Sequence, residues 1–151
     1  MITIFTPVYN RAYIISALYQ SLCKQTSMAF EWLVIDDGST DNIKTVIQQF
    51  IDEAKIDIRF FSQPNGGKHR AINRGVSLAR GSLFFIVDSD DYLEPEALET
   101  CYIKCERQAL DFVFFDADIL NKEKHKNISL NYQRKDCTNP ELVYLKTPNR
   151  S

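Results

Sequence analysis

The chain has 151 residues, of which 44% are hydrophobic and 25% are charged, and its formal net charge is −2. This composition is that of an ordinary globular domain, long enough to bury its own core, and it argues against a disordered chain. The chain also lacks the basic excess that marks a nucleic-acid-binding domain, so we expect no nucleic-acid partner.

Cysteine spacing and the lengths of the apolar runs bear on the cellular compartment. Cys23, Cys101, Cys105 and Cys137 match no zinc-binding pattern, and we expect them to be reduced thiols. We find no charged-then-apolar leader and no apolar run of 18 residues, so we expect a cytoplasmic protein without a transmembrane segment. A basic stretch at 121–126 is interpreted as a solvated loop, and peripheral association with the inner face of the membrane stays open.

Short apolar segments alternate along the chain with segments in which apolar residues recur at helical spacing. We expect strands over 1–6, 30–35, 56–61, 83–87 and 111–115, and helices over 12–23, 43–51, 69–79 and 95–108. Ser39 or Thr40 is expected to cap the second helix, Gly81 to cap the end of the third, and Pro95 to open the fourth. This order predicts an α/β fold, with a Rossmann-like, mostly parallel sheet covered by helices on both faces.

Polar clusters follow the first, second and fourth predicted strands. They are Pro7-Val8-Tyr9-Asn10, Asp36-Asp37 and Asp88-Ser89-Asp90-Asp91. Ligands of open α/β sheets bind beyond the carboxyl ends of the strands, where these clusters fall. Acidic side chains gathered there repel one another, and a divalent cation would offset that repulsion and bridge to phosphate. No dinucleotide-binding GxGxxG motif and no P-loop are present, which disfavours dehydrogenases and kinases.

Several motifs, in order, resemble those of a family 2 glycosyltransferase of the GT-A fold. They are Thr6-Pro7-Val8-Tyr9-Asn10-Arg11, Val34-Ile35-Asp36-Asp37-Gly38-Ser39-Thr40-Asp41, Asn65-Gly66-Gly67, Ala71-Ile72-Asn73-Arg74-Gly75, Ala79-Arg80-Gly81 and Val87-Asp88-Ser89-Asp90-Asp91-Tyr92 with Pro95. The resemblance covers residues 1–120 of what we expect to be one domain, 1–151. It implies that 1–120 form the nucleotide-sugar-binding half and that 121–151 begin the acceptor side. We expect the chain to be truncated there.

The resemblance implies a role for each matching residue in donor binding. Pro7 would shape the floor of the base pocket and Tyr9 would pack on the base. Asp37 would accept a hydrogen bond from the base, which suits uracil, and Asp36 is the alternative. Lys68 and Arg70 would contact the diphosphate, and Gly66 and Gly67 would let their loop open and close over the donor.

The acidic cluster is the counterpart of the family's DxD motif. Asp90 would ligate Mn²⁺ or Mg²⁺ on the diphosphate, and Asp88 would contact the ribose or join the metal shell. Ser89 and Asp91 would face the sugar. Asp116-Ala117-Asp118 is a second DxD pattern, which we interpret as a pair of residues that do not ligate the metal.

The function implied is an inverting glycosyltransferase that moves a sugar from a nucleotide diphosphate, with UDP favoured, to a glycan or lipid-linked acceptor in cell-surface polysaccharide synthesis. The family takes its catalytic base from beyond the DxD region, so we expect that base outside this chain. The alternative is a module that binds a nucleotide sugar, or an inactive fragment, without turnover.

Overall fold

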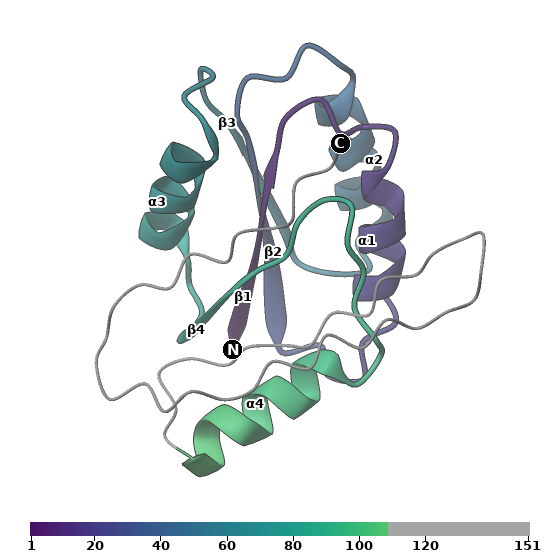
Figure 1. Ribbon diagram of the computed structural model, residues 1–151. Coiled ribbons are helices and arrows are strands. Elements are labelled where there is room, and N and C mark those ends of the chain that lie inside the picture. Colours follow the sequence, from purple (N-terminus) through teal and green to yellow (C-terminus); the bar gives the residue numbers. More distant parts are fainter. Residues whose placement is uncertain (109–151) are drawn as a thin grey trace, which may run out of the picture. The chain divides into compact units, whose positions relative to one another are not determined.

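The structure, a computed structural model, describes residues 1–108, which form a parallel sheet flanked by helices (Figure 1). The strands of this part of the chain are β1 (Ile2–Val8), β2 (Phe30–Asp36), β3 (Ile58–Ser62) and β4 (Leu83–Ile86). Its helices are α1 (Ile15–Leu22), α2 (Ile43–Glu53), α3 (Lys68–Leu78) and α4 (Ala97–Gln108). The α/β fold and the expected order of elements are confirmed here, and the strand expected at 111–115 lies outside the described residues.

The alternation of side chains along the strands builds two apolar layers. Ile4 and Trp32 point to the face covered by α1 and α2, where they pack in one buried cluster with residues such as Leu18. Phe5 and Leu33 point to the opposite face, where they pack against α3. Every residue of β2 is buried, as expected for a central parallel strand covered on both faces. Helices therefore cover both faces of the sheet, as the sequence predicts (Figure 1).

The strand order places a topological switch point between β1 and β4. The order is β3-β2-β1-β4, with all neighbours parallel, so the chain moves outward from β1 to β3 and then returns to the other side of β1. In such sheets the ligand crevice lies at the carboxyl ends of the strands, where the order reverses. The loops after β1 and β4 flank this point, and they carry Tyr9 and Asp88 respectively.

Three local predictions about helix ends are wrong. Neither Ser39 nor Thr40 caps α2, whose N-cap is Asn42, because the Ser39 hydroxyl instead accepts a hydrogen bond from the Asn10 N–H. Gly81 does not cap α3, which ends at Leu78 with Ala79 as its C-cap in extended backbone. Gly81 is small for another reason, since a Cβ there would lie 2.5 Å from the Thr3 nitrogen of β1.

Pro95 does not occupy the first turn of α4 but lies in the turn before Ala97.

None of the helices within residues 1–108 is long and apolar enough to cross a membrane. Everything described here belongs to one unit of the chain, Met1–Val113.

Candidate functional site

The loops after β1 and β2 are joined by hydrogen bonds into one rim of the site. Asn10 has a positive φ of 53°, a conformation that asparagine tolerates better than most residues. Its N–H donates to Ser39 Oγ over 2.9 Å, and its Oδ1 accepts from the Thr40 N–H over 2.8 Å. The Ala12 N–H donates to Asp41 Oδ2 over 2.9 Å. Asn10 and Asp41 had no assigned role in the sequence-based site, although both belong to the motifs that carry the resemblance.

Two residues predicted to hold the base lie at the end of β1. Pro7 is the penultimate residue of the strand and is half-buried, while Tyr9 follows the strand and is 49% exposed. An exposed tyrosine on a loop that is itself fixed offers a flat surface for a ring to stack on.

Asp36 is the last residue of β2 and Asp37 follows it; both are buried, but their carboxylates accept hydrogen bonds from different parts of the chain. Asp36 Oδ1 accepts the Ser39 N–H over 2.8 Å, which closes the turn after the strand. Asp37 reaches across to the loop after β3. Its Oδ1 accepts from Gln63 Nε2 at 2.7 Å and from the Gly66 N–H at 3.0 Å, and its Oδ2 accepts from the Gly67 N–H at 2.7 Å.

The surroundings of Asp37 favour its charged form. Burial alone would raise the pKa of this carboxyl, but the hydrogen bonds from Gln63, Gly66 and Gly67 outweigh burial and hold the pKa below its ordinary value. Asp37 is therefore a buried carboxylate whose charge is balanced by aligned N–H groups. From the sequence, Asp37 is predicted only to bind the base. Its hydrogen-bond partners in the loop after β3 lie 26 to 30 positions further along the chain, so no local pattern predicts them.

The loop after β3, residues 63–67 (the glycine loop), depends on two glycines for its conformation. Gly67 is the N-cap of α3 with φ 89° and ψ 156°, a conformation that side-chain-bearing residues avoid. Gly38, with φ 80°, lies directly under the loop, since a Cβ on it would come within 2.7 Å of the Asn65 nitrogen. These glycines therefore fit the loop against Asp37 and the end of β2. Opening and closing of this loop stays a prediction.

The first turn of α3 is basic, and one of its side chains contacts the acidic loop after β4, residues 88–91. Lys68 Nζ lies 2.6 Å and 2.9 Å from the two oxygens of Asp88, and both side chains are about half-exposed. His69 and Arg70 follow Lys68, and the turn contains no acidic residue. Positive charge at a helix N-terminus opposes the helix dipole, and the Asp88 carboxylate offsets the charge of Lys68 here.

The acidic loop after β4 is a turn closed by the Asp91 N–H, which donates to the Asp88 carbonyl over 3.1 Å. Ser89 is buried, whereas Asp90 and Asp91 are exposed. Partial desolvation, followed by the charges of Asp88 and Asp90, raises the pKa of Asp91. The loop therefore holds mutually repelling carboxylates that a cation would stabilise.

Within residues 1–108, no three histidine, cysteine or acidic side chains converge into a complete metal site. A Mg²⁺ ion that also binds substrate phosphates and water needs only one or two carboxylates from the protein. Asp90 and Asp88 fit that limited role.

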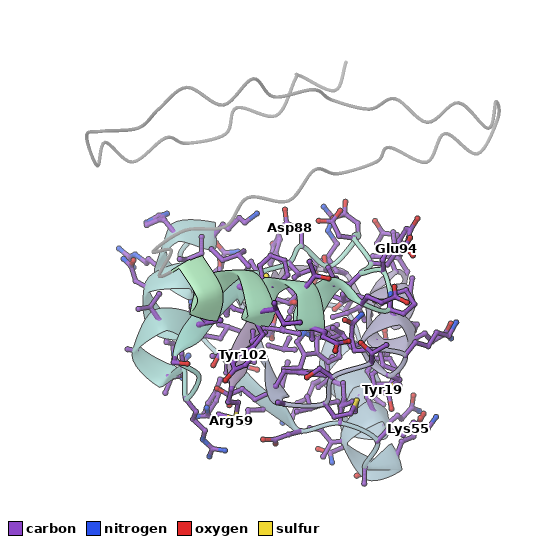
Figure 2. The ribbon with its side chains drawn as sticks, turned by 90° about the horizontal axis from the view of Figure 1, so that it is seen from below. Tyr19, Lys55, Arg59, Asp88, Glu94 and Tyr102 are labelled. Atoms are coloured by element: carbon purple, nitrogen blue, oxygen red, sulfur yellow. The ribbon has the colours of Figure 1, made fainter. Side chains whose placement is uncertain are left out.

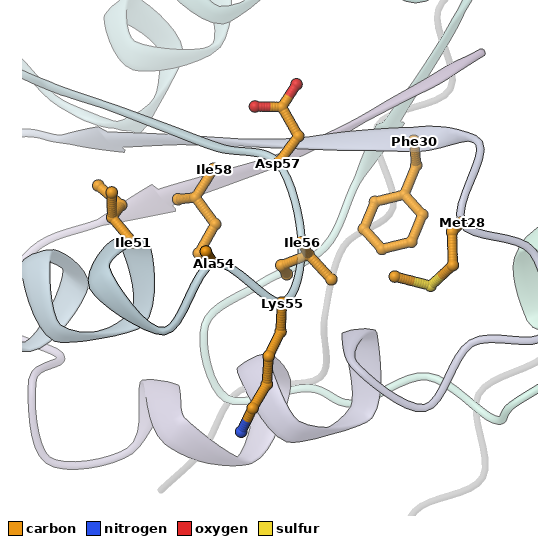
Figure 3. Close-up of a pocket in the computed structure, with 8 residues that line it drawn as sticks. All are labelled: Met28, Phe30, Ile51, Ala54, Lys55, Ile56, Asp57 and Ile58. Atoms are coloured by element: carbon orange, nitrogen blue, oxygen red, sulfur yellow. The ribbon is translucent and has the colours of Figure 1, made fainter.

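A hollow of about 490 Å³ lies away from these loops, at the opposite ends of β2 and β3 (Figure 3). It is lined mainly by apolar side chains, among them Met28, Phe30 and Ile56, with Lys55 and Asp57 at its border. Figure 2 separates the two regions, with Asp88 and Glu94 on one side of the molecule and Lys55 and Arg59 on the other. The hollow contains none of the predicted site residues.

The predicted residues therefore gather at the carboxyl edge of the sheet, in two groups. Tyr9, Asp36 and Asp37 lie on the β1–β2 side, and the acidic loop lies beyond β4. Lys68, which follows the loop tied to Asp37, joins the two groups through its ion pair with Asp88.

Residues 3–147 match the family model described as Glycosyl transferase family 2. The chain belongs to this family. It is 41% identical over 101 residues to the chondroitin synthase of Pasteurella multocida, a match that covers 67% of this chain but only 10% of the synthase. The chain thus spans about a tenth of the length of that relative.

Solved structures agree with the GT-A fold. The structure of Staphylococcus aureus TarS 1–349 in complex with UDP-GlcNAc superposes with a TM-score of 0.67 and 28% identity, covering 72% of this chain and 32% of TarS 1–349. The mannosyltransferase PcManGT of Pyrobaculum calidifontis, solved with GDP-Man and Mn²⁺, shares the fold with a TM-score of 0.57 and 23% identity over 60% of this chain and 28% of PcManGT.

Proposed function

We propose that this chain binds the donor in an inverting, metal-dependent glycosyltransferase that uses a UDP-sugar. The observation that carries the proposal is the switch point between β1 and β4. On one side of it lie an exposed tyrosine and a buried carboxylate, and on the other lies a loop of repelling carboxylates. The likeness to TarS, which is solved with UDP-GlcNAc, supports a UDP-linked donor.

In this proposal the base stacks on Tyr9 over Pro7 and is read by Asp37. A carboxylate oxygen has two acceptor directions, and Asp37 Oδ2 accepts one hydrogen bond, from Gly67. One acceptor position is thus left for the imide N–H of uracil. Adenine offers no ring N–H on this edge, so the same carboxylate would favour uracil, thymine or guanine over adenine. Asp36 is the weaker candidate, because its Oδ1 closes its own turn.

The diphosphate would lie between the acidic loop and the basic turn of α3. Asp90, with Asp88 beside it, would hold Mn²⁺ or Mg²⁺ against the diphosphate, and the ion would stabilise negative charge on the departing nucleoside diphosphate. Lys68 and Arg70 would contact the phosphate oxygens, and the N-terminus of a helix is itself a favourable place for an anion. When donor and metal bind, Lys68 must then break its ion pair with Asp88 and pair with the phosphate oxygens.

The sugar would extend past Ser89 and Asp91 toward an acceptor hydroxyl. The base that deprotonates this hydroxyl in an inverting reaction is assigned to no described residue. The likeness to a chondroitin synthase supports a glycan product of the cell surface, and a lipid-linked acceptor fits the same chemistry. We infer a cytoplasmic location, and contact with the inner membrane face fits such an acceptor.

A second candidate is a donor-binding module without turnover. The chain spans a tenth of the synthase and a third of TarS 1–349, and the remainder of such enzymes would supply the acceptor side. Slow hydrolysis of a UDP-sugar by the purified chain would argue against this candidate.

The test is calorimetric titration of UDP into the purified 151-residue chain with and without Mn²⁺. We expect Mn²⁺ to strengthen binding, Asp90→Asn to abolish that gain, and Asp37→Ala to weaken binding about ten-fold or more whether or not metal is present. Asp52→Asn is the matched control, because this exposed carboxylate on α2 only accepts a hydrogen bond from Gln48. Absence of binding by UDP, and by GDP and TDP beside it, from a folded sample would overturn the proposal.

A further inference from the structure

The segment that follows the acidic loop is anchored to the end of α1. Leu93 comes two residues after Asp91, and its N–H donates to Ser21 Oγ over 3.1 Å. The Ser21 hydroxyl in turn donates to the Leu18 carbonyl within α1 over 2.8 Å. Ser21 is buried, so this hydrogen bond is shielded from water and its loss would leave a buried polar group without a partner.

Gln25, just beyond α1, holds the same segment at two further points. Its Nε2 donates to the Glu94 carbonyl over 2.8 Å, and its Oε1 accepts the Leu98 N–H over 3.2 Å. Leu98 lies in the first turn of α4, where backbone N–H groups have no partner within the helix. Gln25 is only 5% exposed, and among side chains only a carboxamide both donates and accepts in this fixed geometry.

Two neighbouring contacts extend this anchor. The Thr26 N–H donates to the Pro95 carbonyl over 2.9 Å, and the Thr26 hydroxyl donates to Glu99 over 2.8 Å. Leu98 is buried in the core beneath the sheet. The whole turn from 93 to 99 is therefore fastened to the residues that end α1.

The acidic loop depends on this anchor because its other support is short. β4 has only four residues, and pairing with β1 ends with the Val87 N–H on the Phe5 carbonyl, one residue before Asp88. The ion pair from Lys68 to Asp88 is exposed and adds little rigidity. Between them, β4 and the α1 anchor fix both ends of the loop.

We propose that Gln25, together with Ser21, is a positioning residue for the metal-binding loop, setting where Asp90 and Asp88 lie relative to the base pocket at the ends of β1 and β2. Metal ligands must be held within about 0.5 Å of their productive positions, so a supporting residue outside the site controls affinity. This inference rests on the proposed function for its metal, but the anchor itself can be measured separately.

The experiment compares the wild-type chain with Gln25→Met and Gln25→Glu. Methionine keeps the length and loses all three side-chain hydrogen bonds of Gln25, to Glu94, to Leu98 and to the Ser21 carbonyl. Glutamate keeps the acceptor for Leu98 but replaces the donor with an oxygen that repels the Glu94 carbonyl. For both we expect faster amide hydrogen exchange over residues 88–98. We also expect the Mn²⁺-dependent gain in UDP affinity to fall about ten-fold, with metal-free UDP binding unchanged.

Two controls separate positioning from general loss of stability. Gln48→Met changes an exposed glutamine on α2 and should leave both readouts at wild-type values. Ile47→Val trims a fully buried side chain of α2, so it should lower the melting temperature without reducing the Mn²⁺-dependent gain.

Unchanged exchange over 88–98, or an unchanged Mn²⁺ gain in folded Gln25 variants while the wild type shows one, would overturn the inference alone. A wild-type chain that binds UDP without any effect of Mn²⁺ would overturn the metal site of the proposed function, and the positioning role with it. The exchange measurement distinguishes the two failures.

Discussion

Gly67 combines an unusual backbone conformation with a hydrogen bond to a residue of the candidate site. Its φ of 89° with ψ of 156° is open only to glycine, and its N–H is the donor to Asp37 Oδ2. Gly67→Ala should therefore lower the free energy of unfolding by about 1–3 kcal/mol and weaken UDP binding, because relief of the backbone strain would move the N–H at position 67 away from Asp37.

Gly66 provides the matched control for this substitution. A Cβ on Gly66 meets only the Arg70 side chain, which can move, and the residue has no positive φ. Gly66→Ala should therefore cost less stability in urea denaturation than Gly67→Ala. Equal losses for the two variants would show that the conformation at Gly67 is not what shapes this loop.

Residue identity alone predicted which side chains gather at the site but not what each one contacts. Asp37 and Asp88 were placed by their position after strands, since parallel strands end at a common edge. The hydrogen bonds of Asp37 to the glycine loop, and those of Gln25 to Glu94 and Leu98, join residues 26 to 73 positions apart. No local pattern encodes such pairs, and Gln25 in particular looks like an ordinary polar residue after a helix.

At the scale of elements, α3 is the helix that carries the predicted diphosphate contacts, and Gly75 sets its distance from the sheet. Gly75 is buried, and a Cβ added there would overlap the ring of Phe5, which is fully buried on β1. Alanine is the better helix former by about 1 kcal/mol. The steric overlap should nevertheless dominate, because the core on that face has no space to yield.

Gly75→Ala should thus destabilise the chain by about 1–3 kcal/mol and weaken UDP binding as the start of α3 shifts. Val76→Ala is the control, because Val76 is the next residue and is 57% exposed. Urea denaturation and calorimetry measure the two effects. A Gly75→Ala chain at least as stable as the wild type would mean that helix propensity outweighs packing here.

Helix ends were the least predictable feature among the elements. Ser39 and Thr40 had the right chemistry for a cap, yet Ser39 serves the loop after β1 and α2 begins at Ile43 without a side-chain hydrogen bond from its N-cap. Gly81 had the right spacing for a helix stop but is required by close approach to β1. At both positions the residue makes a long-range contact, with the loop after β1 or with β1 itself, and does not cap the helix as the local sequence predicts.

At the scale of the whole described unit, the order of strands and helices could be predicted from periodicity, whereas the strand order and the buried polar contacts could not. The main buried charge is Glu31 on β2, which is fully buried and accepts hydrogen bonds from Thr3 at 2.6 Å, the Arg80 N–H at 2.7 Å and Arg59 at 2.9 Å. Arg59 also donates to the Leu78 carbonyl, so this network ties the end of α3 to the sheet, away from the site.

Glu31 makes the stability of the chain depend on pH. Burial would raise the pKa of Glu31, but the hydrogen bonds from Thr3, Arg80 and Arg59 outweigh burial and lower that pKa in the folded chain. The stabilisation is therefore complete above the ordinary carboxyl pKa of about 4 and is lost as pH falls through the lowered folded value. Asp37, whose pKa is also lowered, acts in the same direction.

Glu31→Gln removes one of these titrations and leaves Arg59 without its buried partner, so it should cost about 3 kcal/mol at pH 7. Because glutamine does not titrate, the free energies of unfolding of variant and wild type should converge as pH falls below about 4 and through the lowered pKa of Glu31. The raised pKa of Asp91 works in the opposite direction but is common to both chains and cancels in the difference. Glu96→Gln, an exposed change before α4, should follow the wild-type curve throughout. The measurement is urea denaturation at a series of pH values. A difference in the free energy of unfolding between Glu31→Gln and wild type that stays constant with pH would mean that Glu31 stabilises the fold by its shape and not by its charge.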